Sequence, residues 1–213
     1  MNVDVVIDVV CPWCFVGKRH LDRAMAARPG LVQAVRYRPY QLNPNTPEDG
    51  VDRDAAYRAK FGDGPELDQM RAQLTRIGAE AGIAFDFTTP VRIANSLDAH
   101  RLIRWALSAG VQAAVADRLM SLYFEEARFI GDHALLADVA GDAGMDRALV
   151  ADLLASDRDK AMIEEEAMAA RQMGVTGVPY YVFNRQAGVS GAQAPEVLMQ
   201  VMDRLAPQVA GEA

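Results

Sequence analysis

The chain has 213 residues, enough for one domain or for one domain with a large insertion, and its hydrophobic fraction of 51% argues against disorder. The net charge is −7 and the sequence contains no basic stripe, which argues against nucleic acid or an anionic membrane as a partner. No apolar run approaches the roughly 18 residues that a membrane-spanning helix needs.

The first part of the chain predicts a strand, a helix and a second strand. Val3 to Val10 is rich in β-branched residues and indicates a buried strand. From Pro12 to about Ala27 the pattern is helical, and a proline fits the first turn because its missing N–H is not needed there. Leu31 to Tyr40 alternates loosely and predicts the second strand, which ends in a cluster of turn residues.

From about residue 52 to residue 174 the pattern is helical almost without interruption. The expected helices cover residues 54–61 and 65–82, a segment capped by Asn95, residues 111–128, and further segments capped by Asp132, Asp146 and Ser156. Strand character returns at Tyr180–Phe183 and at Val189–Ser190, and a closing helix begins at Pro195. The predicted order is therefore β-α-β, a block of helices, and β-β-α.

The only two cysteines, Cys11 and Cys14, lie where the first strand meets the first helix. At the start of a helix, unpaired backbone N–H groups and the positive end of the helix dipole stabilise a negative charge. Thiolate is the reactive form of cysteine, so this position favours a reactive Cys11. Cys14 lies close enough along the chain to form a disulfide with it. The sequence therefore predicts a redox-active dithiol.

Four segments together resemble a known family over nearly the whole chain. They are Cys11–Arg19, which reads CPWCFVGKR, Asn95–Leu102, Gly174–Pro179 and Val189–Gln193. The chain resembles the DsbA-type branch of the thioredoxin superfamily, and within it the FrnE-like thiol–disulfide oxidoreductases. The resemblance implies an α/β, thioredoxin-like fold with a large all-helical insertion. Residues 1–48 and 175–213 would form the thioredoxin-like domain, and residues 49–174 the insertion.

The resemblance also implies roles for individual residues. Cys11 would be the exposed nucleophile that forms a mixed disulfide with substrate, and Cys14 the thiol that resolves it. Pro179 would be a cis-proline packed against the dithiol, with the backbone of Val178 available to an extended substrate segment. The remaining expected substrate-binding residues are Pro12 and Trp13. Substrates would be proteins or small molecules that contain thiols or disulfides.

Asp8 allows two interpretations. It lies three residues before Cys11, where a buried carboxylate would act as a proton relay to or from Cys14. Alternatively, it is an aspartate at the exposed end of a strand. Among the histidines, His20 is interpreted as a surface residue. His100 lies within one of the family-like segments, which is compatible with a place in the substrate groove, a capping role or the surface.

No metal or resident cofactor is expected. Zinc usually takes four ligands, so only a dimer sharing two cysteine pairs would complete a site. Glutathione is a candidate redox partner or ligand. Both cysteines belong to one motif, which leaves none for a structural disulfide, and the N-terminus lacks a basic signal-like region; the prediction is a cytoplasmic protein, monomeric or homodimeric.

Two further classes of function stay open. The kappa-class glutathione transferases and the hydroxychromene-carboxylate isomerases have a similar architecture and use glutathione, but they typically carry a serine at the position of Cys11. The second alternative is a non-catalytic peptide-binding or redox-sensing protein, in which the helical region holds the ligand.

Overall fold

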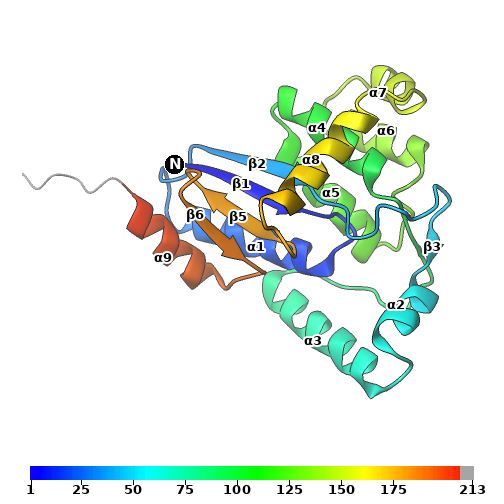
Figure 1. Cartoon of the computed structure of the whole chain (residues 1–213), viewed down its shortest axis with the longest axis horizontal. Helices are drawn as coiled ribbons and strands as arrows, with labels where there is room; N and C mark the ends of the chain where they lie inside the picture. Colours follow the sequence, from blue (N-terminus) through cyan, green and yellow to red (C-terminus); the bar gives the residue numbers. More distant parts are fainter. Residues whose placement is uncertain (207–213) are drawn as a thin grey trace, which may run out of the picture.

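A computed structural model describes residues 1–206, so the end of the predicted thioredoxin-like domain, 207–213, lies outside the described residues. The central sheet has the strand order β2-β1-β5-β6 (Figure 1). β1 pairs with β2 in parallel, and the other neighbours are antiparallel. The strands are β1 (Asn2–Ile7), β2 (Ala34–Pro39), β5 (Tyr180–Phe183) and β6 (Ala187–Ser190).

Helices cover both faces of this sheet. α8 crosses one face, and α1 runs along the other (Figure 1). The helices are α1 (Pro12–Ala26), α2 (Arg53–Phe61), α3 (Pro65–Ala81), α4 (Leu97–Ser108), α5 (Gln112–Phe124), α6 (His133–Asp142), α7 (Arg147–Leu154), α8 (Lys160–Gln172) and α9 (Pro195–Leu205). The predicted fold class, a thioredoxin-like α/β fold with a helical insertion, is confirmed.

A small two-stranded ribbon of β3 (Val51–Asp52) and β4 (Arg92–Ile93) was not predicted from the sequence. Each of its strands has two residues, too few for an alternating pattern to be recognised. β3 leads into α2, and β4 follows α3, so the ribbon joins the two ends of the segment that carries these helices.

The hydrophobic core is continuous between the sheet and the helical region. Phe15 of α1 packs against Phe85 and Phe124, with ring centroids 6.2 Å apart in both pairs, and the latter two rings are 5.5 Å apart. All three side chains belong to one buried cluster. Because the core runs across the predicted boundaries at 48/49 and 174/175, the division into two domains stays a prediction.

A buried glutamine also joins the two regions. Gln112, at the start of α5, accepts a hydrogen bond from the backbone N–H of Tyr37 at 2.9 Å and donates one to its carbonyl at 3.1 Å. Tyr37 lies in β2, the edge strand of the sheet. The side-chain amide therefore satisfies backbone groups that an edge strand otherwise leaves open.

The predicted helix caps are confirmed at two of the expected positions. Asp132 and Asp146 accept backbone N–H groups from the first turns of α6 and α7. The cap predicted at Asn95 is wrong by one residue: Ser96 is the cap of α4, and Asn95 accepts the N–H of Leu97. The cap predicted at Ser156 is wrong: its hydroxyl donates to the Leu153 carbonyl at the end of α7, and α8 begins only at Lys160.

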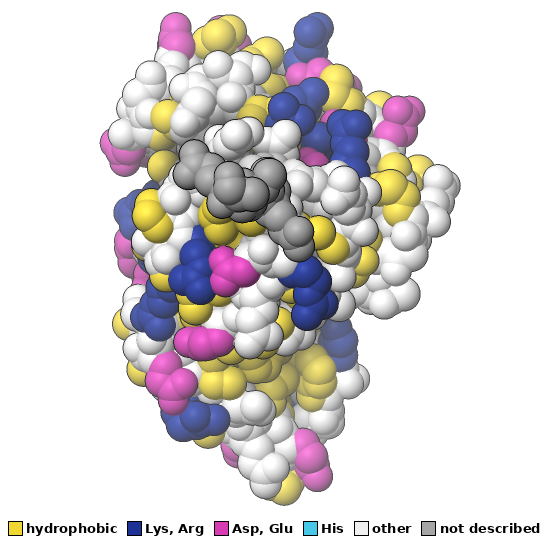
Figure 2. Space-filling view, turned by 90° about the vertical axis from the view of Figure 1, so that its left-hand side faces the viewer, with side chains coloured by type: hydrophobic (Ala, Val, Ile, Leu, Met, Phe, Trp, Pro, Cys, Tyr) yellow, Lys and Arg dark blue, Asp and Glu magenta, His cyan; other side chains and the backbone are white. Residues whose placement is uncertain are grey.

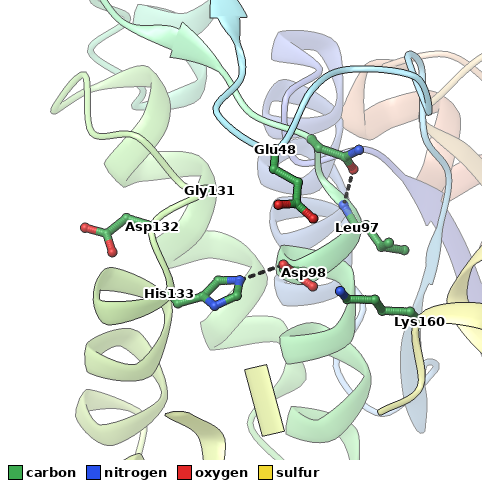
Figure 3. Close-up of a pocket in the computed structure, with 8 residues that line it drawn as sticks. Glu48, Leu97, Asp98, Gly131, Asp132, His133 and Lys160 are labelled. Carbon is green, nitrogen blue, oxygen red and sulfur yellow. Dashed lines mark hydrogen bonds and ion pairs between the residues drawn. The ribbon is translucent and has the colours of Figure 1, made fainter. Parts of the chain in front are cut away.

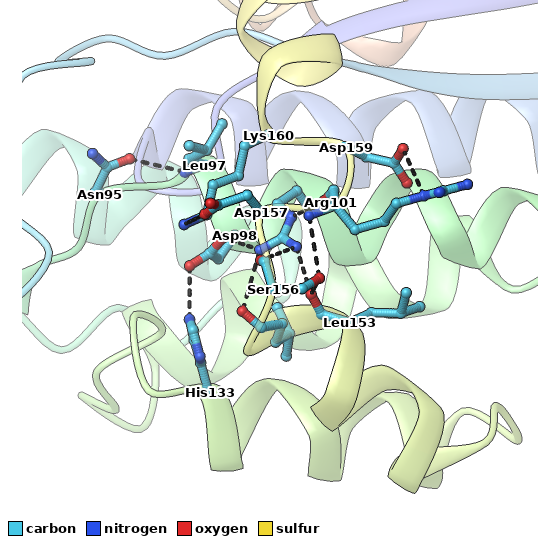
Figure 4. Close-up of polar contacts among 12 residues, drawn as sticks. Asn95, Leu97, Asp98, Arg101, His133, Leu153, Ser156, Asp157, Asp159 and Lys160 are labelled. Carbon is cyan, nitrogen blue, oxygen red and sulfur yellow. Dashed lines mark hydrogen bonds and ion pairs between the residues drawn. The ribbon is translucent and has the colours of Figure 1, made fainter.

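Arg101 of α4 holds the end of α7 and the segment that follows it (Figure 4). The side chain is buried, and one terminal nitrogen donates to the carbonyls of Leu153 at 2.6 Å and Ser156 at 2.8 Å. Its Nε donates to the Arg158 carbonyl at 2.7 Å, and the other terminal nitrogen lies 2.6 Å from the Asp98 carboxylate. One guanidinium thus satisfies groups from three segments of the chain.

Replacing this guanidinium should destabilise the protein strongly. We expect Arg101→Met to lower the free energy of unfolding by about 3–5 kcal/mol, because it leaves buried carbonyls and a carboxylate without their partner. Arg158→Met is the matched control, since that side chain is 70% exposed and should contribute less than about 0.5 kcal/mol. Denaturant unfolding of both variants measures the difference, and equal stability of the two would contradict this account.

Positive and negative side chains are interspersed on the face that carries α9 (Figure 2). Arg28 and Asp203, for example, form an ion pair there with Nε and Oδ1 2.7 Å apart. Within the described part of the chain, none of the helices has the length and hydrophobicity that a bilayer crossing requires.

Candidate active site

The dithiol lies at the junction of β1 and α1. β1 ends at Ile7 instead of continuing to Val10 as predicted, because the chain turns there: the N–H of Cys11 donates to the carbonyl of Asp8 at 3.0 Å. Cys11 is the cap residue of α1, with an extended backbone, and Pro12 is the first helical residue. The N–H of Cys14 donates to the Cys11 carbonyl at 3.0 Å. The first helical turn therefore brings the two cysteines together.

Cys14 is completely buried. Burial raises the pKa of its thiol well above the usual value, and a hydrogen bond and charge interaction with Cys11 raise it further. The backbone N–H of Asp8 points at its sulfur, 3.5 Å away, and acts in the opposite direction. In the reduced protein, Cys14 therefore keeps its proton near neutral pH.

The burial and the raised pKa of Cys14 predict selective alkylation of the reduced protein. Near neutral pH, we expect iodoacetamide to modify Cys11 well before Cys14, and labelling of Cys14 should rise only at pH values well above about 8.5, the ordinary value for a thiol. Peptide mapping by mass spectrometry across a pH series measures both rates. In denaturant, the two cysteines should react alike, and equal labelling in the folded protein would contradict the prediction.

Cys11 is 5% exposed, which corrects the expectation of an exposed nucleophile. The physical reason is the segment that contains Val178 and Pro179, which covers it. The Cys11 Sγ lies 3.7 Å from the Val178 carbonyl oxygen and can donate to it. The Val178–Pro179 peptide bond is cis, the form that the resemblance implies. Cys11 and Val178, far apart in the sequence, are therefore in direct contact.

The other expected substrate-binding residues lie around this contact. Pro12 and Trp13 are half-buried, as is Val178, whereas Pro179 is buried. Pro179 packs against Gly17 of α1 so closely that a Cβ on that glycine would lie 2.7 Å from the proline Cγ. Helix α1 therefore supports the proline segment directly, one turn beyond Cys14.

Asp8 is completely buried, so the interpretation as an exposed strand end is wrong. Its Oδ1 accepts the N–H of Val10 at 3.3 Å, and its Oδ2 accepts the N–H of Leu42 at 2.7 Å. Hydrogen bonds from backbone N–H groups stabilise an ionised carboxylate. The buried carboxylate thus belongs to the turn that carries the dithiol.

His20 is not the surface residue that was expected, and for His100 the surface interpretation is wrong. The side chain of His100 is buried beside Asp8, with Nε2 3.1 Å from the Tyr40 carbonyl oxygen and 3.6 Å from Oδ1 of Asp8. His20 is half-buried, and its Nδ1 lies 2.9 Å from the carbonyl oxygen of Gln193. His20 therefore connects α1 to the segment before α9, and His100 connects α4 to the turn before α1. No local sequence pattern reveals these contacts.

Two tyrosines near the dithiol were not identified from the sequence. Burial raises the pKa of Tyr57, on α2, to about 12, and the charge of Cys11 contributes to the increase. Burial also raises the pKa of Tyr123, on α5, and the charge of Asp8 contributes there. Helical periodicity places such residues on an inner face, but it does not indicate which distant residue they meet.

A cavity of about 400 Å³ lies away from the dithiol, between the starts of α4, α6 and α8 (Figure 3). It is lined by Glu48, Asn95, Leu97, Asp98, Gly131, Asp132, His133 and Lys160. Asp98 is paired with Arg101 and with His133, whose Nε2 lies 2.7 Å from Oδ2, and Lys160 is paired with Asp157 at 2.9 Å. The contact between Asp98 and His133 joins the starts of α4 and α6, whereas Lys160 is paired within the segment that leads into α8.

Comparisons with known proteins agree with this geometry. The family of DSBA-like thioredoxin domains matches residues 2–203. A probable DsbA oxidoreductase from Streptomyces coelicolor is 30% identical, with a TM-score of 0.88 over 100% of this chain and 93% of that one. A search of curated proteins found no significant match.

Two more distant structures show the same fold. A 2-hydroxychromene-2-carboxylate isomerase is 22% identical, with a TM-score of 0.74 over 96% of both chains. The cytosolic disulfide reductase DsbM from Pseudomonas aeruginosa, solved with GSH, is 16% identical, with a TM-score of 0.65 over 96% of this chain and 100% of that one. Because the family match spans nearly the whole sequence, the chain belongs to the family of DSBA-like thioredoxin domains.

Proposed function

We propose that this protein catalyses thiol–disulfide exchange through Cys11 and Cys14. The observation that carries the proposal is the asymmetry of the pair: Cys11 caps the helix, and Cys14 is fully buried and retains its proton. The contact between the Cys11 sulfur and the Val178 carbonyl also places a backbone edge beside the nucleophile, where an extended substrate can add as a strand. Pro179, Pro12 and Trp13 complete the surface around it.

The reaction transfers two electrons in two steps. The Cys11 thiolate attacks one sulfur of the substrate disulfide, a mixed disulfide forms, and the other substrate sulfur leaves as a thiolate. Cys14 then loses its proton and attacks the Cys11 sulfur, which forms the internal disulfide and releases the second substrate thiolate. In the opposite direction, a substrate thiolate attacks the Cys11 sulfur of the oxidised protein. The reduction potential decides which direction dominates.

Asp8 serves as the proton relay in the resolving step. Its carboxylate is buried in the turn whose backbone N–H contacts the Cys14 sulfur, and its charge interacts with that thiol. Because Cys14 is protonated in the resting reduced state, the attack requires a base, and a carboxylate is suited to this role. The proton ends on the departing substrate thiolate.

We further propose that the chain belongs to the FrnE-like subfamily, because it resembles that subfamily in the four segments Cys11–Arg19, Asn95–Leu102, Gly174–Pro179 and Val189–Gln193. Substrates are thiol- or disulfide-containing proteins or small molecules, and glutathione is a candidate for recycling the pair. A cytoplasmic location agrees with the use of both cysteines in one motif. Monomer and homodimer are both compatible with the proposal.

A Cys14→Ser variant tests the proposal directly. Without the resolving thiol, we expect a disulfide substrate to stay attached to Cys11 as a stable mixed disulfide, because the second step is blocked. Intact mass spectrometry detects the adduct, which a reductant should release. Cys11→Ser is the matched control and should form no adduct. An adduct on Cys14 in that control, or none in Cys14→Ser, would contradict the proposed roles.

The main alternative is a glutathione-dependent isomerase or transferase, for which the similarity in fold to the isomerase is the supporting observation. Calorimetry with glutathione on a Cys11→Ser/Cys14→Ser double variant separates the two functions. Tight binding retained without the sulfurs would favour the alternative, whereas loss of binding favours exchange. A non-catalytic peptide-binding or redox-sensing protein would show neither turnover nor rapid reoxidation.

A further inference from the structure

His100 connects the helical region to the buried Asp8 carboxylate, which lies in the turn before Cys11. It lies on α4, and its Nε2 faces two oxygens, the Tyr40 carbonyl at 3.1 Å and Oδ1 of Asp8 at 3.6 Å. A carbonyl oxygen only accepts hydrogen bonds, so Nε2 must carry the proton. The same Nε2 atom lies 3.6 Å from Oδ1 of Asp8, beyond hydrogen-bond distance, and both side chains are buried.

His100 also acts on Asp8 through the backbone. By bonding the carbonyl of Tyr40, it fixes the segment that leads to Leu42, and the N–H of Tyr40 is itself bonded to the Ile7 carbonyl at 2.9 Å. The N–H of Leu42 then donates to Oδ2 of Asp8 at 2.7 Å. His100 thus supports the segment from which Leu42 binds Oδ2 of Asp8.

The other charged or titratable groups around this pair come from each neighbouring element. α1 contributes the two cysteines, and α5 contributes Tyr123, whose pKa burial raises so that it stays neutral. From α8, the guanidinium of Arg171 lies 4.5 Å from the centre of the Tyr40 ring and donates to the Gln41 carbonyl. Among these groups, His100 has the side-chain nitrogen that lies 3.6 Å from the carboxylate.

We propose that His100 is a positioning residue for the resolving step of the exchange reaction. It keeps the Asp8 carboxylate oriented, so that this carboxylate can take the proton of Cys14. The Cys14 thiolate then attacks the Cys11 sulfur, the Cys11–substrate bond breaks, and the proton passes to the departing substrate thiolate. The inference rests on the proposed exchange function and assigns a role to the helical region within it.

Losing the His100 N–H should slow the second step and leave the first unchanged. Without its bond to the Tyr40 carbonyl, the segment that holds Leu42 against Oδ2 of Asp8 is released, and the carboxylate is no longer held in place for the proton transfer. A single hydrogen bond contributes about 0.5–1.5 kcal/mol, which corresponds to a slowing of the second step by about two- to tenfold.

A single-turnover experiment separates the two steps. The reduced protein is mixed with an aromatic disulfide reagent whose thiolate product absorbs visible light. The first release reports attack by Cys11, and the second reports resolution by Cys14. For His100→Phe, we expect an unchanged first release and a second release that is slower by about two- to tenfold. His100→Gln is the matched variant, since its amide retains an N–H donor of similar reach, and it should restore the rate of the second release.

Each outcome decides between the interpretations. An unchanged rate of the second release in His100→Phe would overturn the positioning role, as would a failure of His100→Gln to restore that rate. If His100→Phe does not fold, His100→Asn replaces it, because its amide is too short to reach the Tyr40 carbonyl. In an Asp8→Asn background, His100→Phe should slow the second release no further. Absence of any release from the wild-type protein would instead refute the exchange function itself.

Discussion

A Cys11→Ser variant is expected to lose thiol–disulfide exchange by several orders of magnitude while it keeps its fold. A serine hydroxyl is not ionised near neutral pH and forms no disulfide, so neither direction of the reaction remains available. The substitution is small, and the residue is 5% exposed in a turn held by backbone hydrogen bonds. Exchange with a model disulfide, followed in both directions, measures the loss.

The control for this prediction is structural. Circular dichroism and the unfolding midpoint should change little in Cys11→Ser, which separates loss of chemistry from loss of structure. Cys14→Ser should retain the attack on a disulfide but not turnover. Appreciable multiple turnover by Cys11→Ser would mean that another group is the nucleophile.

Gly17→Ala should impair both stability and exchange. Its Cβ would lie 2.7 Å from the Cγ of Pro179 and would also meet the hydroxyl of Tyr181, so the proline segment has to move away from α1. Overpacking of this kind costs about 1–3 kcal/mol. Because the same movement withdraws Val178 from Cys11, we expect exchange to fall by about tenfold to a hundredfold.

Gly177→Ala is the matched control in the same segment. A Cβ at Gly177 would have no neighbouring atom within 4 Å, so this variant should change stability by less than about 0.5 kcal/mol. Denaturant unfolding and exchange rates of the two variants give the comparison. Equal behaviour of Gly17→Ala and Gly177→Ala would show that the contact between α1 and Pro179 has no importance for the reaction.

The sequence predicted the order of the main elements and the place of the dithiol because both depend on local patterns. The β-branched run before Cys11, the proline after it, and the helical spacing from residue 52 onward are all readable within a few turns of chain. The family-like segments added Pro179, which lies far from Cys11 in the sequence. Boundaries were less accurate: β1 ends at the turn that Asp8 forms, and Ser156 belongs to the end of α7.

The surroundings of the dithiol could not be predicted, because they arise from contacts between distant segments. Asp8 had two equally reasonable interpretations until its burial was known. His100 and Tyr57 lie on helices whose periodicity defines an inner face but not the residue opposite. The covering of Cys11 by Val178 likewise depends on how the chain returns after the helical region.

The packing of Phe15 against Phe85 and Phe124 bears on how this protein can be altered. A shortened chain that joined residue 48 directly to residue 175 would keep every strand of the main sheet, yet it would leave the ring of Phe15 without these two partners. Helix α1 would then expose to water an aromatic ring that the full chain buries. The helical region thus completes the core beneath the helix that carries Cys14, and we expect the shortened chain to be less stable than the full one.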